Sequence, residues 1–155
     1  MQEIITDRYM LRKVKKEDAQ CIYEILSDEQ VITNLNMNIH KTLEDTYKMI
    51  EDYEKGYTQK EKYPYAIIEK DTNKFIGVFL IKLDLYDEDC FEFTIYLAKS
   101  EWNKGIYTEV LPYMVKVAFE EIKTGNFRGF VMEKNKSSSR VLEKCGFELE
   151  KIFEV

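Results

Sequence analysis

Apolar and polar residues in the first part of the chain follow first a strand-like and then a helical period. Residues 8–14 (RYMLRKV) have the composition of a short strand. From Ala19 to Leu26 the apolar side chains recur every three to four positions, as in a helix with one buried face. We therefore expect a first strand, followed by an amphipathic helix over residues 16–28.

A second helix is expected after the polar stretch of residues 34–41 (NLNMNIHK). Thr42 can cap its N-terminus. Asp45, three residues later, can complete a capping box by binding the Thr42 N–H, as a shorter side chain in place of the usual glutamate. Gly56 is a residue type that commonly ends a helix. This segment therefore predicts a capped helix between Thr42 and Gly56.

The period then changes from helical to β. Residues 63–70 (YPYAIIEK) and 74–83 (KFIGVFLIKL) are separated by residues 71–73 (DTN), which predicts a hairpin. Residues 90–97 (CFEFTIYL) and 126–132 (NFRGFVM) predict two further strands.

A helix of about residues 105–122 is expected between these last two strands. Such a β-α-β unit requires parallel strands joined by a right-handed crossover. Pro112 lies within the helical segment, so the helix either begins later than Gly105 or kinks near residue 108.

The last part of the chain predicts a short helix over residues 137–144 that ends at Gly146, and a closing strand over residues 147–155 (FELEKIFEV). The order of all these elements predicts an α+β fold with a mixed central sheet and flanking helices. With 155 residues, 45% of them hydrophobic, the chain is expected to form one domain over residues 1–155.

Composition narrows the classes of function. The formal net charge is −6, which argues against nucleic acid as a partner and favours cationic ligands such as amines, unless the charge only maintains solubility. Three cysteines without metal-ligand spacing predict neither a disulfide framework nor a metal site. We expect no signal peptide and no membrane span, and hence a cytoplasmic protein.

Gly105 lies at the expected start of the helix that follows the strand of residues 90–97. A helix N-terminus carries free N–H groups and the positive end of the helix dipole, and a residue without Cβ lets an anion approach closely. A glycine there can equally be a turn residue. Gly105 alone does not decide between an anion site and a turn.

Three motifs, taken in their order along the chain, favour the anion site over a simple turn at Gly105. They are a strand (FEFTIYL), a loop (SEWNKGIYTEVL), and an Asn followed by a short helix that stops at Cys-Gly-Phe (NKSSSRVLEKCGFELE). Together they resemble the GNAT superfamily of N-acetyltransferases, and within it the branch that acetylates protein N-termini, including those of ribosomal proteins. The matching residues are Glu92, Thr94, Tyr96 and Leu97; Trp102, Asn103, Lys104, Gly105, Ile106, Tyr107, Thr108 and Glu109; and Asn135, Ser138, Arg140, Val141, Leu142, Glu143, Lys144, Gly146 and Phe147.

The resemblance implies acetyl-CoA as co-substrate. Backbone N–H groups of the loop would hold the pyrophosphate, and the strand backbone would pair with the pantetheine arm and polarise the thioester carbonyl. Asn135 would bind the pantetheine or close the turn before the helix. The implied cofactor-binding residues are Ile95, Tyr96, Leu97, Asn103, Lys104, Gly105, Ile106, Tyr107, Thr108 and Asn135.

Two residues are candidates for the proton transfers. Glu92 lies on the strand that lines the acceptor site in the family and could act as general base, or it could simply face solvent. Many GNAT enzymes protonate the leaving thiolate with a tyrosine at the position of Leu142, so that donor is missing here. Ser138 is the replacement that the resemblance implies, unless it only caps the helix, and Ser139 is the alternative.

Some residues depart from the family pattern. Tyr107 occupies a place usually held by Gly or Ala, and Asn103 replaces a glycine, although Asn tolerates left-handed geometry. We expect His40 either to touch an acceptor or, more simply, to lie on the surface. The chain ends at Val155, where the family has a final hairpin that walls the acceptor site, so a homodimer could complete that wall.

Two functions follow as hypotheses. The first is an acetyl-CoA-dependent N-acetyltransferase that acts on a primary amine, either a protein N-terminus or a small amine. The second is a GNAT-fold protein that binds CoA, or has lost it, without turnover. Tyr107 and the missing tyrosine donor favour the second.

Overall fold

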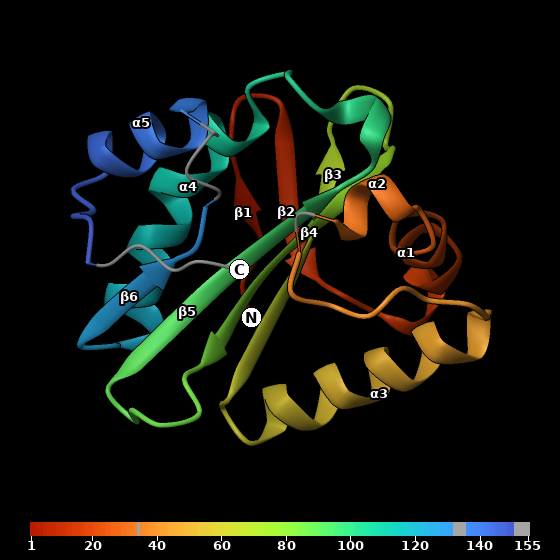
Figure 1. The fold of residues 1–155 in the computed structure, drawn as a ribbon, viewed down its shortest axis with the longest axis horizontal. Coiled ribbons are helices and arrows are strands. Elements are labelled where there is room, and N and C mark those ends of the chain that lie inside the picture. The colour runs from red at the N-terminus through yellow and green to blue at the C-terminus, as the bar shows by residue number, and fades with distance from the viewer. Residues whose placement is uncertain (34, 132–135, 151–155) are drawn as a thin grey trace.

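A computed structural model of the chain describes residues 1–33, 35–131 and 136–150. Its centre is a six-stranded sheet in the order β1-β2-β3-β4-β5-β6 (Figure 1). All neighbouring strands are antiparallel except β5 and β6, which are parallel. The strands are β1 (Ile4–Ile5), β2 (Tyr9–Lys13), β3 (Lys62–Glu69), β4 (Phe75–Leu83), β5 (Cys90–Leu97) and β6 (Asn126–Gly129).

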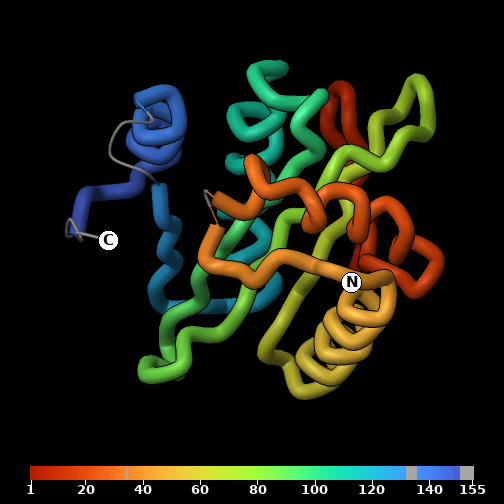
Figure 2. The backbone as a smooth tube through the Cα atoms, turned by 45° about the vertical axis from the view of Figure 1, so that its right-hand side comes forward, coloured from red at the N-terminus to blue at the C-terminus, as the bar shows by residue number. Residues whose placement is uncertain are grey.

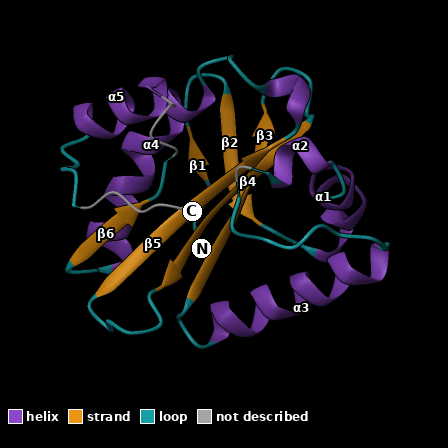
Figure 3. Cartoon of the chain, viewed as in Figure 1, coloured by secondary structure: helices purple, strands orange, loops and turns teal. Residues whose placement is uncertain are grey.

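Helices cover both faces of the sheet. Figures 2 and 3 show α3 and α5 on opposite sides of the strands. One face is covered by α1 (Ala19–Leu26), α2 (Glu29–Ile32) and α3 (Leu43–Thr58), and the other by α4 (Ile106–Lys116) and α5 (Lys136–Lys144). The expected α+β fold with a mixed sheet is therefore confirmed.

The two faces of the sheet have separate cores. On β4, Phe79 and Ile81 point toward α4 and α5, whereas Val78 and Leu80 point toward the first three helices. Because successive side chains of a strand alternate between faces, a strand covered on both sides is apolar at nearly every position. This explains the continuous apolar run in β4.

The helix predicted between Thr42 and Gly56 is α3, which begins as predicted and ends later. The Thr42 hydroxyl accepts a hydrogen bond from the Asp45 N–H, and the Asp45 carboxylate accepts one from the Thr42 N–H, which completes a capping box. Gly56 does not end α3, which continues to Thr58. Gly56 is instead a packing position, because a Cβ there would lie 2.6 Å from the side chain of Lys62.

The β5-α4-β6 unit has the parallel pairing that the sequence predicts. Its helix begins at Ile106, one residue after Gly105, and contains Pro112 in its interior. Pro112 has no N–H to donate to the carbonyl four residues earlier. After Lys116 the chain continues as a π-helical turn, η3 (Val117–Ile122).

The end of the chain departs from the expected closing strand. Gly146 takes a left-handed conformation (φ 90°), and the N–H groups of Gly146 and Phe147 bond back to Glu143 and Leu142, which ends α5. Residues 147–150 are not a strand, so this part of the expectation is wrong, and residues 151–155 lie outside the described range. The Leu149 side chain is 79% exposed, so it does not pack against the sheet as an apolar residue of a half-buried strand would.

Other boundaries differ modestly. The sequence did not predict β1, which has only two residues, and the helix expected over residues 16–28 is a 3-10 turn (Lys16–Asp18) followed by α1. The β3–β4 hairpin is confirmed, with Asn73 in the left-handed region (φ 59°) of its turn. No helix among the described residues is long and apolar enough to cross a membrane.

Candidate functional site

Residues 103–108, called the loop 103–108 below, comprise a short loop (103–105) and the first residues of α4 (106–108). Asn103 (φ 62°) and Gly105 (φ 74°) are both left-handed, and Gly105 is the N-cap of the helix. The first intrahelical bond runs from the Glu109 N–H to the Gly105 carbonyl, at 3.1 Å. The N–H groups before Glu109 therefore have no acceptor within the helix and can hold an anion.

Side chains of this loop divide between solvent and core. Asn103, Lys104 and Thr108 are exposed, whereas Ile106 is 2% exposed and packs into the core beneath the loop. Ile106, one of the predicted cofactor-binding residues, can therefore contact a ligand only through its backbone.

Glu109 ties the start of α4 to the N-terminal strands. Its carboxylate accepts a short hydrogen bond from the Thr6 hydroxyl, one from the Arg8 N–H at 2.8 Å and one from Arg8 Nε at 2.7 Å. Burial raises the pKa of Glu109, but these donors outweigh it and the pKa lies below its usual value. The charged carboxylate therefore holds the loop in place.

A second buried carboxylate lies directly before the loop. Glu101, in the 3-10 turn η2 (Lys99–Glu101), is 2% exposed and pairs with Lys74 and Lys104, each at 3.0 Å. Burial raises its pKa, yet the two ammonium groups lower it by more, so the pKa is below the ordinary value. Sequence analysis did not single out Glu101 or Lys74.

β5 is paired along only part of one edge. β4 pairs with it as far as Leu97, whereas the described pairing with β6 ends at Phe93 opposite Gly129 (Figure 1). The Trp102 indole N–H donates to the Leu97 carbonyl at 3.2 Å. The strand end predicted to bind pantetheine, residues 95–97, therefore lies beyond the β6 pairing and is fastened to the loop.

The Tyr96 side chain lies in the core, so only its backbone is available to a ligand at this strand end. Its ring is 2% exposed in the core under α1 and α3, where its hydroxyl lies 2.9 Å from that of Tyr53. Burial raises the pKa of both phenols. This pair fixes the strand to α3.

Tyr107 points into the molecule. Its ring packs on the cluster under α4 and α5, 6.3 Å from the ring of Phe93, and burial raises the pKa of its hydroxyl. The ring therefore faces the sheet rather than outward, although a smaller residue is usual at this position in the family.

Glu92 lies on the opposite face of β5 from Phe93, as the alternation predicts. Its carboxylate is 3.3 Å from Lys82 Nζ on β4, and its side chain is 19% exposed. On the β6 side its register partner is Arg128, whose guanidinium pairs with Glu150 at 3.1 Å. Glu92 is thus a partly buried carboxylate beside one lysine.

The remaining predicted residues lie in α5 or directly before it. Ser138 and Ser139 lie near the start of α5 and are partly buried. Leu142, where the family often has tyrosine, is buried against the core. Asn135 lies outside the described residues.

His40 is buried, so the expectation of a surface histidine is wrong. It is 8% exposed, and its Nδ1 lies 2.8 Å from the Thr46 hydroxyl on α3. Burial lowers its pKa. His40 therefore fastens the segment before α3 rather than contacting solvent.

Comparisons with known proteins decide the family. The "Acetyltransferase (GNAT) domain" family matches residues 8–148. The chain belongs to the GNAT acetyltransferase family. It is therefore an acyltransferase, and the resemblance drawn from its three motifs is confirmed.

Individual relatives agree with this assignment. An uncharacterized N-acetyltransferase, YoaA, of Bacillus subtilis is 25% identical over 145 residues, covering 94% of this chain and 82% of YoaA. The ribosomal-protein-S5-alanine acetyltransferase of Vibrio fischeri has the same fold, with a TM-score of 0.82 at 16% identity over 96% of this chain and 84% of that one. The spermidine N-acetyltransferase of Vibrio cholerae, solved with CoA and spermine, has a TM-score of 0.79 at 17% identity, covering 93% and 83%.

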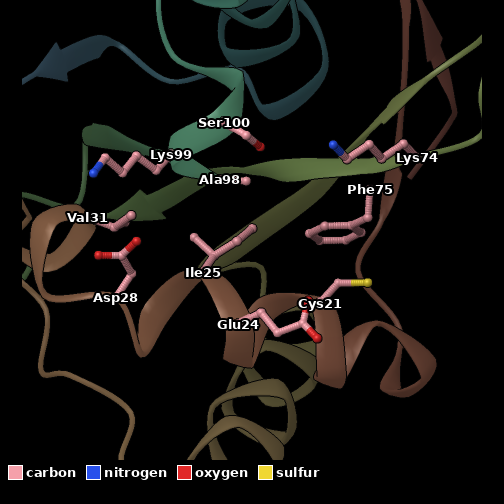
Figure 4. Close-up of a pocket in the computed structure, with 10 residues that line it drawn as sticks. All are labelled: Cys21, Glu24, Ile25, Asp28, Val31, Lys74, Phe75, Ala98, Lys99 and Ser100. Carbon is pink, nitrogen blue, oxygen red and sulfur yellow. The ribbon is translucent and has the colours of Figure 1, made fainter.

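The GNAT domain also has a cavity beside η2, which Lys74, Lys99 and Ser100 help to line. It has a volume of about 370 Å³ between α1 and the adjoining ends of β4 and β5 (Figure 4). Its lining is mixed, with the carboxylates of Glu24 and Asp28, the ammonium of Lys99 and the ring of Phe75. None of the predicted site residues lines it. No group of His, Cys, Asp and Glu within the described ranges could hold a metal ion.

Proposed function

We propose that this chain is an acetyl-CoA-dependent N-acetyltransferase that transfers the acetyl group directly to a primary amine. One observation carries the proposal: the loop 103–108, with its left-handed Gly105, is fastened by Trp102 to the end of β5 that extends past β6. A candidate anion site and a strand edge that extends past the described pairing with β6 thereby lie next to each other.

The loop fits the phosphate end of CoA. A Cβ on Gly105 would lie 3.5 Å from the Arg8 guanidinium, so the glycine leaves its backbone accessible beside a cation. N–H groups of the first turn of α4 would bind the pyrophosphate. The backbone of residues 95–97 would pair with the pantetheine amides as an added strand does.

When bound, acetyl-CoA supplies an activated acetyl group as its thioester. The amine nitrogen must lose a proton to form the new C–N bond, and the departing thiolate must gain one as the C–S bond breaks. Glu92 would accept the amine's proton through water. The Ser138 hydroxyl would donate to the thiolate, with Ser139 as the alternative.

An amine acceptor is favoured by two facts. The two structural neighbours are named for amine-bearing acceptors, an alanine of ribosomal protein S5 in one case and spermidine in the other. The net charge of −6 attracts cationic acceptors. We therefore propose a protein N-terminus or a small amine as the acceptor class.

One observation favours a rival function. Lys82 lies 3.3 Å from Glu92 and competes with water for the carboxylate, as expected of a structural ion pair. A GNAT domain that binds CoA without turnover would tolerate such a pair.

Thiol release separates the two functions. The protein is incubated with acetyl-CoA and a panel of polyamines, amino acids, aminoglycosides and N-terminal peptides, while free CoA and acetylated products are measured by thiol titration and mass spectrometry. The enzyme predicts release of one thiol for each acetyl group gained by an amine. CoA binding without release across the panel would support the rival.

A further inference from the structure

Glu101 holds two lysines where one would neutralise it. Burying a carboxylate is unfavourable unless a cation and hydrogen bonds compensate. One ammonium balances the charge, and here Oε1 accepts from Lys74 while Oε2 accepts from Lys104, both at 3.0 Å. The cluster of these three residues therefore keeps an excess of one positive charge.

The two ammonium groups are positioned to bind something else. The lysine side chains are 53% and 50% exposed although their partner carboxylate is 2% exposed. An ammonium has three donors, so each lysine retains donors beyond the one given to Glu101. In Figure 4 the amino end of Lys74 is directed toward η2, the turn that carries Ser100.

The cluster adjoins the anion site. Lys104 directly precedes Gly105, and Lys74 lies in the turn between β3 and β4. By contrast, the charge of Arg8, whose guanidinium lies near Gly105, is neutralised by Glu109. The excess positive charge of the cluster of Lys74, Glu101 and Lys104 therefore lies beside Gly105.

We infer that Lys74 binds the pyrophosphate of CoA together with Lys104, and that Glu101 is a positioning residue for both lysines. The inference rests on the proposed function, since it needs CoA at the loop. It adds a cofactor contact from the β3–β4 turn, a segment outside all three motifs.

Calorimetric titration with CoA, dephospho-CoA and pantetheine tests the role of Lys74. Loss of one charge-assisted contact weakens binding about tenfold or more. We expect Lys74→Met to show this loss with CoA and dephospho-CoA, which share the pyrophosphate, and no change with pantetheine, which lacks it. Lys116→Met, with the same change of charge at the other end of α4, should bind all three ligands as the wild type does.

Glu101→Gln tests the positioning role through the sign of its effect. The variant makes the site more positive by one charge, so simple attraction would strengthen CoA binding. If Glu101 positions the lysines, CoA binding weakens by several fold despite the extra charge. Thermal unfolding of the free variant, compared with wild type, shows that the domain remains folded.

The outcomes separate the inference from the proposed function. A wild-type protein that fails to bind CoA overturns both. The inference alone is overturned if Lys74→Met binds CoA like wild type, if it loses pantetheine equally, or if only the 3′-phosphate matters, so that dephospho-CoA binding is unchanged. Tighter CoA binding by Glu101→Gln overturns the positioning role.

Discussion

The loop end of the sheet and the middle of β5 hold their carboxylates differently. Glu101 and Glu109 each accept from two or more donors and have lowered pKa values, so they remain charged and fix the loop 103–108. Glu92 lies beside a single lysine at 3.3 Å on a neighbouring strand. We therefore propose that the first two carboxylates shape the cofactor site and that Glu92 serves the chemistry.

Removing the Glu92 carboxylate should have the largest effect. Glu92→Gln keeps the shape but removes the base, and general base catalysis contributes about 10²–10⁴ in rate. We expect the turnover number to fall within that range, with CoA affinity unchanged and partial rescue at higher pH, where more amine is neutral. Glu88→Gln, an exposed residue with the same change of charge, is the control. Wild-type turnover in Glu92→Gln would place the base elsewhere.

Changing the loop glycine should remove cofactor binding rather than chemistry. Gly105→Val places a branched side chain at φ 74°, which strains the backbone by about 1–3 kcal/mol and covers the N–H groups. Acetyl-CoA should no longer raise the melting temperature, as it does by mass action for wild type. Gly146→Val is a matched control, because that glycine is also left-handed (φ 90°) but has open space around it. Equal loss of the acetyl-CoA shift in both variants would assign the effect to strain.

Tyr107 tests whether the unusual loop residue belongs to the core or to the cofactor site. Because its ring packs near Phe93, Tyr107→Ala should destabilise the protein by about 2 kcal/mol or more in chemical denaturation. Tyr107→Phe, which keeps the ring, should be close to wild type. CoA affinity of the folded protein should change little in either variant. Markedly tighter CoA binding by Tyr107→Ala would instead show that the ring obstructs the cofactor.

Acidification should give the smallest effect and separate His40 from the two loop carboxylates by pH. Burial lowers the folded-state pKa of His40 below 6.5, so below that pH the unfolded chain binds a proton that the folded chain resists, and stability falls. Protonation of Glu101 and Glu109 lowers the stability of the fold only when the pH falls below 4.5, the usual pKa of a glutamate. The melting temperature of His40→Asn should therefore fall less than that of wild type between pH 7 and 5. Parallel curves would assign no titration to His40.

Periodicity predicted most of the fold. β5 matches residues 90–97 at both ends, and the Thr42 capping box was visible because its partners are three residues apart. The closing strand was wrong for residues 147–150, since alternation cannot show whether an apolar surface exists for Leu149 to cover. Gly56 was misread as a helix end because its packing partner, Lys62, lies on another element.

The candidate site was predicted less completely. The loop and the end of β5 carry local motifs, so Gly105 and residues 95–97 could be found from sequence. Lys74 lies 30 residues before Lys104 in the numbering, and its ion pair with Glu101 depends on how the sheet brings two turns together. No local spacing reports such a contact. The roles of Glu92 and Ser138, and the homodimer, stay predictions.

The most direct measurement of the central claim is the position of CoA, mapped by changes in backbone amide chemical shifts on titration. The largest changes are predicted at residues 95–97 and 103–108, with weaker ones around Lys74. Shifts centred on α1 around Cys21 and Glu24, or no shifts at saturating CoA, would contradict the account.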